Sequence, residues 1–501
     1  MNNKQISTSS ISILSERAGN VYNPEDVITF HVNANEVPLL NSKETFLRFY
    51  VEMVGNCKAQ LDSRAAASAV IERITITTED STTLEEIDDY ATYLATHHHY
   101  NNTLGLRNKR AVEEGQSPND DLNSVYFNMP SSGAQLGQPL YRKVECIVPL
   151  YLSGILYGSK AFPVAATSGI VVKIYLSSSK KAIYAYNRTG YVDATDQRFA
   201  LASTLTAAAH TTLDISSASV PAGALKASLF NVPYCVGQTI NIKDNGGVTV
   251  NVGEIQSITQ VAGDNIRLTF PSFTLATAAN AGNFVWGNTS SFDCKYNLSN
   301  VELICGVISP PKQYFQALMK KMSSDGGLAM DIQTFNLYRN NVDSGQTATQ
   351  VLINSTEERA LSMVQTFINP NFSLTTSSYL PVIDTIQNYG YVLKNKNIPN
   401  LKVDCSRYSN ATADDWNAQQ VAEATKALDK AKVSVMREDS NKEHFCIGRR
   451  LATDGYSCDI KNNDVRLNLQ YSAPTVNKLM NSRVYHIRNL QIKPGAVQVV
   501  Y

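Results

Sequence analysis

Three consecutive histidines, His97, His98 and His99, form the clearest candidate for a metal site in this sequence. Imidazole nitrogens bind zinc and other transition metals, but the ligands of a site must converge on one ion. Consecutive helical residues point about 100° apart, so three adjacent side chains on a helix cannot reach the same ion. The run lies at the expected C-terminal end of a helix, where positive charge is favoured. We therefore expect a solvated helix end and no metal.

A run of carboxylates precedes the histidines and could supply a pair for acid–base catalysis. Its members are Glu79, Asp80, Glu85, Glu86, Asp88 and Asp89. Thr83 and Glu86 have the spacing of a capping box, and helical spacing then continues through Leu84, Ile87, Ala91 and Leu94. Negative charge is favoured where a helix begins. The run is therefore interpreted as the solvated face of a helix that begins near residue 84.

The remaining patterns also fall short of a chemical site. Asp459, Lys461 and Asn463 begin like a calcium loop, but Asp464 occupies the position of the required glycine and Gln470 that of the required glutamate. The sequence contains no GxSxG, HExxH, GxGxxG or phosphate-binding GxxxxGK[ST] motif. We expect no catalytic, cofactor-binding or metal-binding residues, no cofactor, no small-molecule substrate and no enzymatic activity.

The charge balance argues against a protein whose main task is to coat nucleic acid or an anionic membrane. The chain has 501 residues, with Lys and Arg equal in number to Asp and Glu at 44 each. Eight cysteines are scattered without a CxxC pair, which favours free thiols in a reducing cytosol. The first 24 residues are polar and resemble no signal peptide. Synthesis in the cytoplasm is expected.

Alternation with a period of two recurs along the whole chain and indicates half-buried β-strands. It is clearest at residues 28–32, 47–53, 170–176, 465–471 and 497–501.

Helices are few. One is predicted after Pro310-Pro311, with an apolar face of Tyr314, Phe315, Leu318, Met319 and Met322, ending at Gly326-Gly327. Another runs from about Asp414, with an apolar stripe of Val421, Ala424, Leu428, Ala431 and Val435. The fold class is all-β.

The segment from about 190 to 290 differs in composition, because it is rich in Ala, Thr, Val and Gly and poor in charge. Residues 244–247 (DNGG) and 263–264 (GD) separate alternating runs and predict two hairpins. We interpret the segment as a small inserted β domain. The predicted organisation is an N-terminal arm (1–24), a first β domain (25–310) that contains the insertion, and a second β domain (311–501), with the helix after Pro311 as the bridge.

Several segments resemble the double jelly-roll major capsid proteins of icosahedral double-stranded DNA viruses, and most of all those of virophages and polinton-like viruses. In the first half they are 71–76 (IERITI) with 84–87 (LEEI), and 147–156 (IVPLYLSGIL) with 161–164 (AFPV) and 169–177 (GIVVKIYLS). In the second half they are 389–393 (YGYVL) with Ile398-Pro399, 446–449 (CIGR) and 466–469 (RLNL). The resemblance covers residues 25 to 501 apart from the insertion.

The resemblance implies two eight-stranded jelly rolls in one chain, with a few short helices and the inserted β domain. It also implies a structural subunit of the virion. Three chains would form a homotrimer of near-hexagonal outline, and such capsomers would tile the shell. The implied partners are other copies, neighbouring capsomers, minor capsid or vertex proteins, and an internal membrane or the genome at the N-terminal arm.

Two alternatives stay open: a vertex or spike protein of the virion, and a β-rich carbohydrate-binding or glycoside-hydrolysing protein. The insertion interrupts the first jelly roll before its closing strand, 296–308, and must leave and re-enter the barrel through a loop. We expect it to project outward as a small tower, with lateral packing between subunits as the alternative.

Overall fold

The computed structural model describes most of the chain between residues 7 and 500. The residues outside the description are 1–6, 18, 56–58, 63, 101–103, 116–142, 186–199, 217–238, 262–264, 284, 288–293, 325–326, 373–377, 380–381, 383–385, 406–417, 431–444, 453–456, 462, 494–495 and 501.

The first half of the chain folds into two facing antiparallel sheets. One sheet has the order β1 (Ser7–Leu14), β18 (Cys294–Ser309), β4 (Leu39–Gly55) and β8 (Val144–Pro149), with the short β2 (Val21–Tyr22) also paired to β18. The other has the order β3 (Val27–Val32), β9 (Ile170–Leu176), β6 (Ile71–Thr78) and β7 (Thr83–Asp88). Numbered along the chain, the eight main strands form sheets 1-8-3-6 and 2-7-4-5, which is the jelly-roll topology.

The alternation seen in the sequence places one face of each sheet in the core. In β3, Ile28, Phe30 and Val32 are fully buried. Phe30 lies opposite Val172 of β9, whose buried residues alternate in the same way. The predicted strands at 28–32, 47–53, 170–176 and 465–471 are therefore confirmed, and the final strand is β27 (Ala496–Val500).

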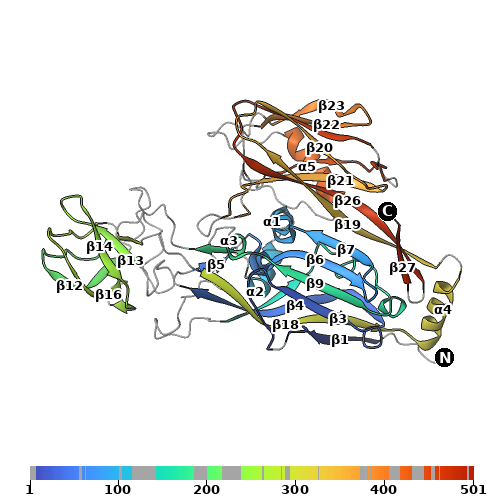
Figure 1. The fold of residues 1–501 in the computed structure, drawn as a ribbon, viewed down its shortest axis with the longest axis horizontal. Coiled ribbons are helices and arrows are strands. Elements are labelled where there is room, and N and C mark those ends of the chain that lie inside the picture. The colour runs from blue at the N-terminus through green and yellow to red at the C-terminus, as the bar shows by residue number, and fades with distance from the viewer. Residues whose placement is uncertain are drawn as a thin grey trace.

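The second half repeats the same topology. One sheet has the order β19 (Leu328–Val342), β26 (Lys478–Lys493), β21 (Ala360–Ile368) and β24 (Ile447–Arg450), with β27 beside the end of β26. The other has the order β20 (Ala348–Ile353), β25 (Val465–Tyr471), β22 (Ile386–Leu393) and β23 (Lys396–Asp404). The chain is thus a double jelly roll, as expected, and the two jelly rolls lie against each other (Figure 1).

The helices lie in the connections between strands. α4 (Lys312–Met322) bridges the jelly rolls as predicted, with Met322 buried and Tyr314 exposed. α5 (Ala418–Lys430) confirms the helix expected from about Asp414 and buries Ala424 and Leu428, whereas residues 414–417, Ala431 and Val435 of that prediction lie outside the described residues. α1 (Tyr90–Tyr100) and α2 (Leu104–Glu113) follow β7. Among the described residues, no helix is both long and apolar enough to cross a membrane.

The capping box predicted at Thr83 to Glu86 is wrong. These residues belong to β7, which forms a hairpin with β6, and α1 begins only at Tyr90. The register pairs Ile74 with Ile87, so Leu84 and Ile87 reach the core from a strand, and only Ala91 and Leu94 reach it from α1. Tertiary pairing overrides the local helix signal here.

The N-terminal arm predicted for residues 1–24 also needs correction, because part of it belongs to the first jelly roll. β1 pairs along its whole length with β18, from Ser7 opposite Ser309 to Leu14 opposite Glu302. Ile11 and Ile13 alternate with serines, which is the pattern of a half-buried strand, and Ile13 is indeed buried against the first jelly roll. The exact domain limits at 25, 310 and 311 stay predictions.

The described parts of the insertion form a separate β domain between β9 and β18. One sheet has the order β11 (Ala200–Leu201), β12 (Ala209–Ser216), β16 (Asn265–Thr274) and β15 (Ser257–Val261). The other has the order β14 (Thr249–Glu254), β13 (Thr239–Lys243) and β17 (Val285–Gly287). The hairpin β13–β14 and the pair β15–β16 confirm the two predicted hairpins. The domain has a hydrophobic core of its own, which contains residues of the insertion only.

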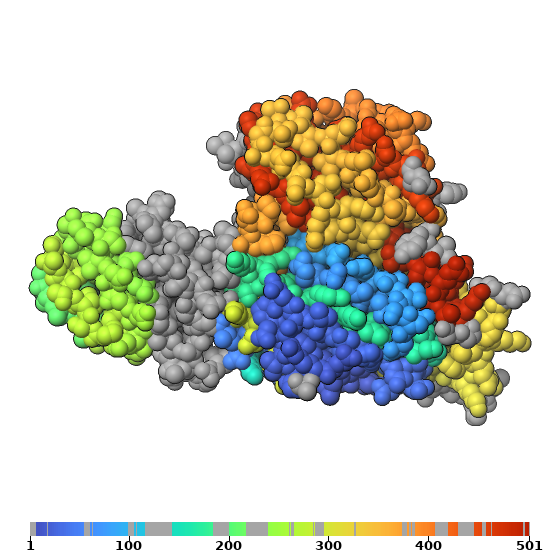
Figure 2. Space-filling model, viewed as in Figure 1, coloured from blue at the N-terminus to red at the C-terminus, as the bar shows by residue number. Residues whose placement is uncertain are grey.

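Figures 1 and 2 show the inserted domain at one end of the molecule and α4 at the opposite end, where β1 begins opposite Ser309. The insertion replaces the connection between the seventh and eighth strands. The connection between the third and fourth strands lies at the same end, because its β5 (Ala59–Leu61) pairs with β10 (Ile183–Ala185), which follows β9. The insertion therefore extends from the end of the barrel and leaves its strand pairing intact.

Candidate functional site at the junction of the jelly rolls

The first jelly roll packs on the outer face of the β19–β26–β21–β24 sheet, so this sheet is covered on both faces. The hydrophobic cluster of the first jelly roll includes Ile332, Phe335 and Tyr485 of that sheet. Arg488 of β26 donates a 2.9 Å hydrogen bond from Nη1 to the Leu84 carbonyl of β7. The junction is thus a buried interface within one chain.

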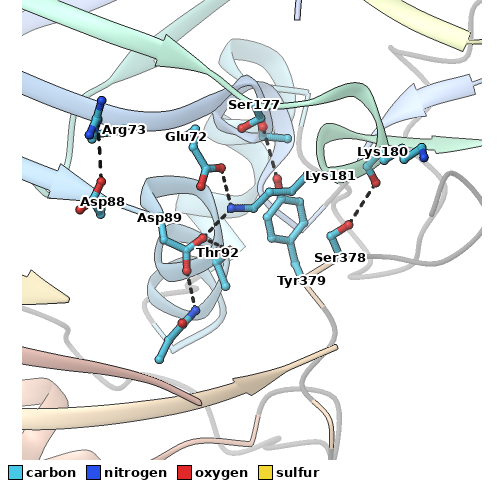
Figure 3. Close-up of polar contacts among 12 residues, drawn as sticks. Glu72, Arg73, Asp88, Asp89, Thr92, Ser177, Lys180, Lys181, Ser378 and Tyr379 are labelled. Atoms are coloured by element: carbon cyan, nitrogen blue, oxygen red, sulfur yellow. Dashed lines mark hydrogen bonds and ion pairs between the residues drawn. The ribbon is translucent and has the colours of Figure 1, made fainter. Parts of the chain in front are cut away.

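Asp89 is the centre of a buried polar cluster at this junction (Figure 3). It lies between β7 and α1 with φ of 52°, a left-handed conformation that Asp tolerates better than most residues. Its Oδ1 accepts hydrogen bonds from Lys181 Nζ and Thr92 Oγ1, each at 2.6 Å. Its Oδ2 accepts from two residues of β26, Asn481 Nδ2 at 2.6 Å and Arg483 Nη2 at 2.9 Å. One carboxylate therefore joins three separate parts of the chain.

The charges of this cluster compensate one another. Lys181 Nζ also donates to Glu72 Oε2 at 2.6 Å, and Glu72 Oε1 lies 3.8 Å from Arg339 Nη2. Burial by itself would raise the pKa of Asp89, but the charges of Lys181 and Arg483 outweigh it and hold that pKa below its usual 3.8. Burial opposes the charge of Lys181 too, yet Asp89 and Glu72 raise its pKa above 10.5. Both groups are ionised at neutral pH.

A second buried carboxylate, Glu85, fixes the loop that follows β8. Its Oε2 accepts a 2.6 Å hydrogen bond from Ser153 Oγ, and its Oε1 accepts a 2.7 Å bond from the Gly154 amide. The Gly154 amide would be costly to bury without a partner. Gly154 lies directly against β19, because a Cβ built on it would be 2.6 Å from the Gln333 carbonyl oxygen. Glu85 therefore holds this loop against the second jelly roll.

The interpretation of the acidic run as a solvated helix face is wrong, because none of the six residues lies on a helix and two of them are not solvated. Glu85 and Asp89 are buried and hold the junction. The other four stay near the surface: Glu86 and Asp88 lie 3.4 and 3.9 Å from Arg73, Glu79 lies 3.3 Å from His31, and Asp80 accepts from Thr78. Alternation along β7 explains the split, since Glu85 points inward and Glu86 outward.

The histidine run does lie at the end of α1, but it is not a solvated helix end. His97 is 5% exposed and His98 is fully buried, because α2 and residues 150–157 cover this end of the helix. The side chain of His99 lies outside the described residues. Across the described parts of the chain, no group of three or more His, Cys, Asp or Glu side chains is placed to hold a metal ion.

The remaining candidates also make structural contacts. Lys461 pairs with Glu358 at 2.6 Å, and Asn463 donates to the Lys461 carbonyl. An open pocket of about 440 Å³ lies at the edge of the junction, lined by residues such as Lys160, Asp331 and Gln333. Asp331 is held there by Arg359, through 2.9 and 3.2 Å hydrogen bonds. The buried contacts at the junction are suited to fixing the two jelly rolls in one orientation.

Sequence analysis missed Lys181, Asn481 and Arg483. They are polar residues of no recognisable motif, and Arg483 lies 394 positions from Asp89. The sequence of β26 does carry one sign that this strand is buried on both faces. β26 is buried along both faces for most of its length, and its sequence (KLMNSRVYHIRNLQIK) mixes polar with apolar residues where a solvated sheet would alternate them.

Comparison with known proteins supports the fold. No protein-family profile and no curated sequence matches the chain. Among solved structures, it is similar to the PBCV-1 protein VP54 fitted into a reconstruction of the virophage Sputnik, with a TM-score of 0.51 and 9% identity over 100% of this chain and 98% of that one. A chain of the PBCV-1 virus capsid gives a TM-score of 0.50 at 9% identity over 100% and 98%. The Faustovirus major capsid protein gives 0.50 at 8% identity over 98% and 92%.

These similarities extend over both jelly rolls and the bridge between them. At such low identity they show a shared fold, the double jelly roll, and they agree with the strand order derived above.

Proposed function

We propose that this chain is the major capsid protein of an icosahedral double-stranded DNA virus. The observation that carries the proposal is the pair of complete jelly rolls with identical strand order, fixed side by side through a buried junction. Chains of a virus capsid and a major capsid protein match that arrangement along their whole length. A vertex protein with a single jelly roll would have no need of this junction.

In the proposed assembly, three chains form a homotrimer whose six jelly rolls give a near-hexagonal outline. A closed ring of this kind satisfies every copy of the interface. Capsomers then contact neighbouring capsomers, and minor capsid or vertex proteins complete the shell. Residues before β1 would face an internal membrane or the genome, and the insertion, at the opposite end of the molecule, would face outward. The protein would reside in the virion.

The first test is the native mass of the purified protein. Light scattering should give about three times 55.0 kDa, because an obligate interface burying over ~2,000 Å² does not dissociate at micromolar concentration. Electron microscopy of the same sample should show particles of six-sided outline. A monodisperse monomer at micromolar concentration would contradict the trimer.

The second test is expression in host cells followed by electron microscopy of the lysate. Shells or flat hexagonal arrays of capsomers are expected, either alone or after addition of minor capsid proteins. Glycan binding by a stable monomer, with no assembly under either condition, would favour the carbohydrate-binding alternative.

A further inference from the structure

A second buried polar cluster lies at the far end of α1, remote from Asp89. His98 Nε2 is 3.4 Å from Glu114 Oε2, and both side chains are fully buried. Tyr151 donates a 3.0 Å hydrogen bond from its hydroxyl to Glu114 Oε1. Arg110 of α2, also buried, donates from Nη1 to the His98 carbonyl at 3.4 Å. The cluster holds α1, α2 and the loop after β8 together.

The two histidines are packed as neutral aromatic rings. His97 stacks on Tyr151 with ring centroids 6.2 Å apart, and His98 meets the same ring edge-on at 5.4 Å. Both ring nitrogens of His98, and Nδ1 of His97, lack a hydrogen-bond partner among the described residues. A proton on either ring would therefore place a poorly solvated charge in the interior.

The Arg110 charge also opposes protonation of the rings, whereas the Glu114 carboxyl, 3.4 Å from His98 Nε2, would favour it when ionised. Arg110 is the buried cation, with Cζ 5.6 Å from the Tyr151 ring, and Glu114 is the one buried carboxyl of this described cluster. Nearer the surface, α2 contributes Lys109 paired with Glu113 at 3.7 Å, and β8 contributes the exposed Glu145 and the buried Cys146. Further titratable groups on the described elements packed here are Tyr90 of α1 and Tyr157, and η1 (Ala66–Val70) has none. β6 carries Glu72 and Arg73, but Glu72 pairs with Lys181, and Arg73 lies beside Glu86.

The pKa values follow from this arrangement. Burial, and after it the charge of Arg110, lowers the pKa of His98 well below 6.5. The pKa of His97 is lowered well below 6.5 by burial, by His98 and by Arg110. Burial raises the pKa of Glu114 to about 7, against the opposing effect of Arg110. At neutral pH the cluster is closed with both histidines uncharged.

α1 connects this cluster to the junction of the jelly rolls. Tyr93 lies one helical turn before His97, on the same side of the helix. Its ring packs on Phe335 and Tyr485 at 5.4 and 5.7 Å, and the Arg483 guanidinium lies 4.7 Å from its centroid. The short helix thus contacts the second jelly roll at one end and is covered by α2 at the other.

We propose that α1 is an acid-sensitive latch, in which proton uptake by His97 and His98 undocks the α1–α2 segment and loosens the contact between the jelly rolls. The cause is that the open segment exposes both rings to water, where protonation is favourable. The latch is a property of the chain itself and would operate whether or not the chain builds a shell.

The pH window follows from linkage. A histidine whose pKa is lower in the folded state than in the open state favours folding above pH 6.5, and this stability is lost as the pH falls below 6.5. Glu114 acts in the opposite sense, because its raised pKa costs stability as pH rises from 4.5 to about 7. Between about pH 6.5 and 4.5, opening takes up two protons at the histidines and releases one from Glu114. The opening constant should therefore rise up to about tenfold per pH unit.

The test is hydrogen–deuterium exchange of the full-length protein from pH 7.5 to 4.5, with rates divided by the intrinsic rate at each pH. Peptides from α1 and α2 should lose protection up to about tenfold per pH unit below 6.5. Peptides from β22, in the core of the second jelly roll, should keep theirs. Exchange at the imidazole C2 position should show both histidines still unprotonated at pH 6.

Three variants make the assignment specific. Glu114→Gln removes the opposing proton and should steepen the loss to as much as about a hundredfold per unit. The double variant His97→Gln/His98→Gln should reverse the effect, with a gain in protection of up to about tenfold per pH unit on acidification, because only the proton released by Glu114 then counts. Should the double variant fail to fold, His97→Gln alone should give a nearly flat profile. His486→Gln, a buried histidine elsewhere whose pKa is lowered to about 4, and the partly exposed His210→Gln should keep the wild-type slope in α1.

An α1 profile in the wild type that is flat from pH 7.5 to 4.5 would overturn the proposal. So would histidines that titrate near 6.5 in the closed state, or a His97→Gln/His98→Gln variant that retains the acid-induced loss.

Discussion

Gly154 and Gln333 meet so closely that the first residue has no room for a side chain. The position of a Cβ on Gly154 would lie 2.6 Å from the Gln333 carbonyl oxygen and 3.3 Å from both Glu85 Oε1 and Ile332 Cβ. Two of these four residues belong to the first jelly roll and two to β19 of the second. Because the nearest contact is a backbone atom, a methyl group here can be accommodated only if the jelly rolls shift apart.

We expect Gly154→Ala to lower the free energy of unfolding by about 1–3 kcal/mol, as overpacked sites do. Gly105→Ala is the matched control, because Gly105 lies in α2 with nothing within 4 Å of its added Cβ. That variant should be neutral or slightly stabilising, since Ala has the higher helix propensity. Denaturant titration measures both. Equal stability of the two variants would contradict the close contact.

Arg483→Met should cost about 3–5 kcal/mol, because it leaves the buried Asp89 carboxylate short of a compensating charge. The surface pair of Arg267 and Asp214, at 2.7 Å, gives the control, and Arg267→Met should leave the unfolding midpoint unchanged within error. Combining Arg483→Met with Asp89→Asn should cost less than the sum of the single changes. Strict additivity would mean that the two residues do not interact.

The pH dependence of the Asp89 contribution should differ from that of the histidine cluster. A carboxyl with a lowered folded pKa contributes stability that is present above its unfolded pKa of 3.8 and lost only as pH falls through the folded value. The difference in melting temperature between wild type and Asp89→Asn should therefore stay constant from pH 8 to 4.5. Differential scanning fluorimetry across this range measures it. A difference that shrinks between pH 6 and 5 would contradict the lowered pKa.

The insertion should behave as an independent unit. Its core residue Phe270 is buried among other residues of the insertion, so Phe270→Ala should unfold or loosen that domain alone, with a local cost of about 3–5 kcal/mol. Replacing residues 200–287 with a short Gly/Ser linker should leave the native mass and the main melting transition intact. Loss of the folded trimer in the deletion variant would show that the insertion acts as a clamp between subunits.

Limited proteolysis of assembled particles tests where the insertion projects. Cleavage between Ala207 and Ala281 with the shell still intact is the expected result for an outward tower. Full protection of this segment, with cleavage elsewhere on the outer surface, would favour lateral packing between subunits.

The fold could be predicted from the sequence to the extent that one face of each strand meets water. Ile28, Phe30 and Val32 alternate with polar residues because β3 is half solvated, and the pattern therefore identifies the strand. The two hairpins of the insertion were readable from their turn residues. The resemblance of scattered segments to capsid proteins then supplied the arrangement of the two halves.

The junction could not be predicted in the same way, because its residues are defined by partners far away in the chain. Asp89 and His98 lie in a local context typical of a solvated helix, and only packing by β26, α2 and the loop after β8 buries them. The same holds for Glu85, whose inward direction depends on β7 being a strand. Local spacing identified these residues as polar and charged but gave no information on what covers them.

A segment near the start of the inserted domain lies beside a segment near its end. The Leu201 amide donates a 2.9 Å hydrogen bond to the Asn283 carbonyl, and the Gly282 amide returns one of 2.9 Å to the Leu201 carbonyl. A module whose entry and exit segments lie close together can be exchanged for another without moving either flanking strand. The inserted domain is therefore the part of this chain that can diversify most freely, or be engineered to carry foreign sequences, while the strands of both jelly rolls stay unchanged.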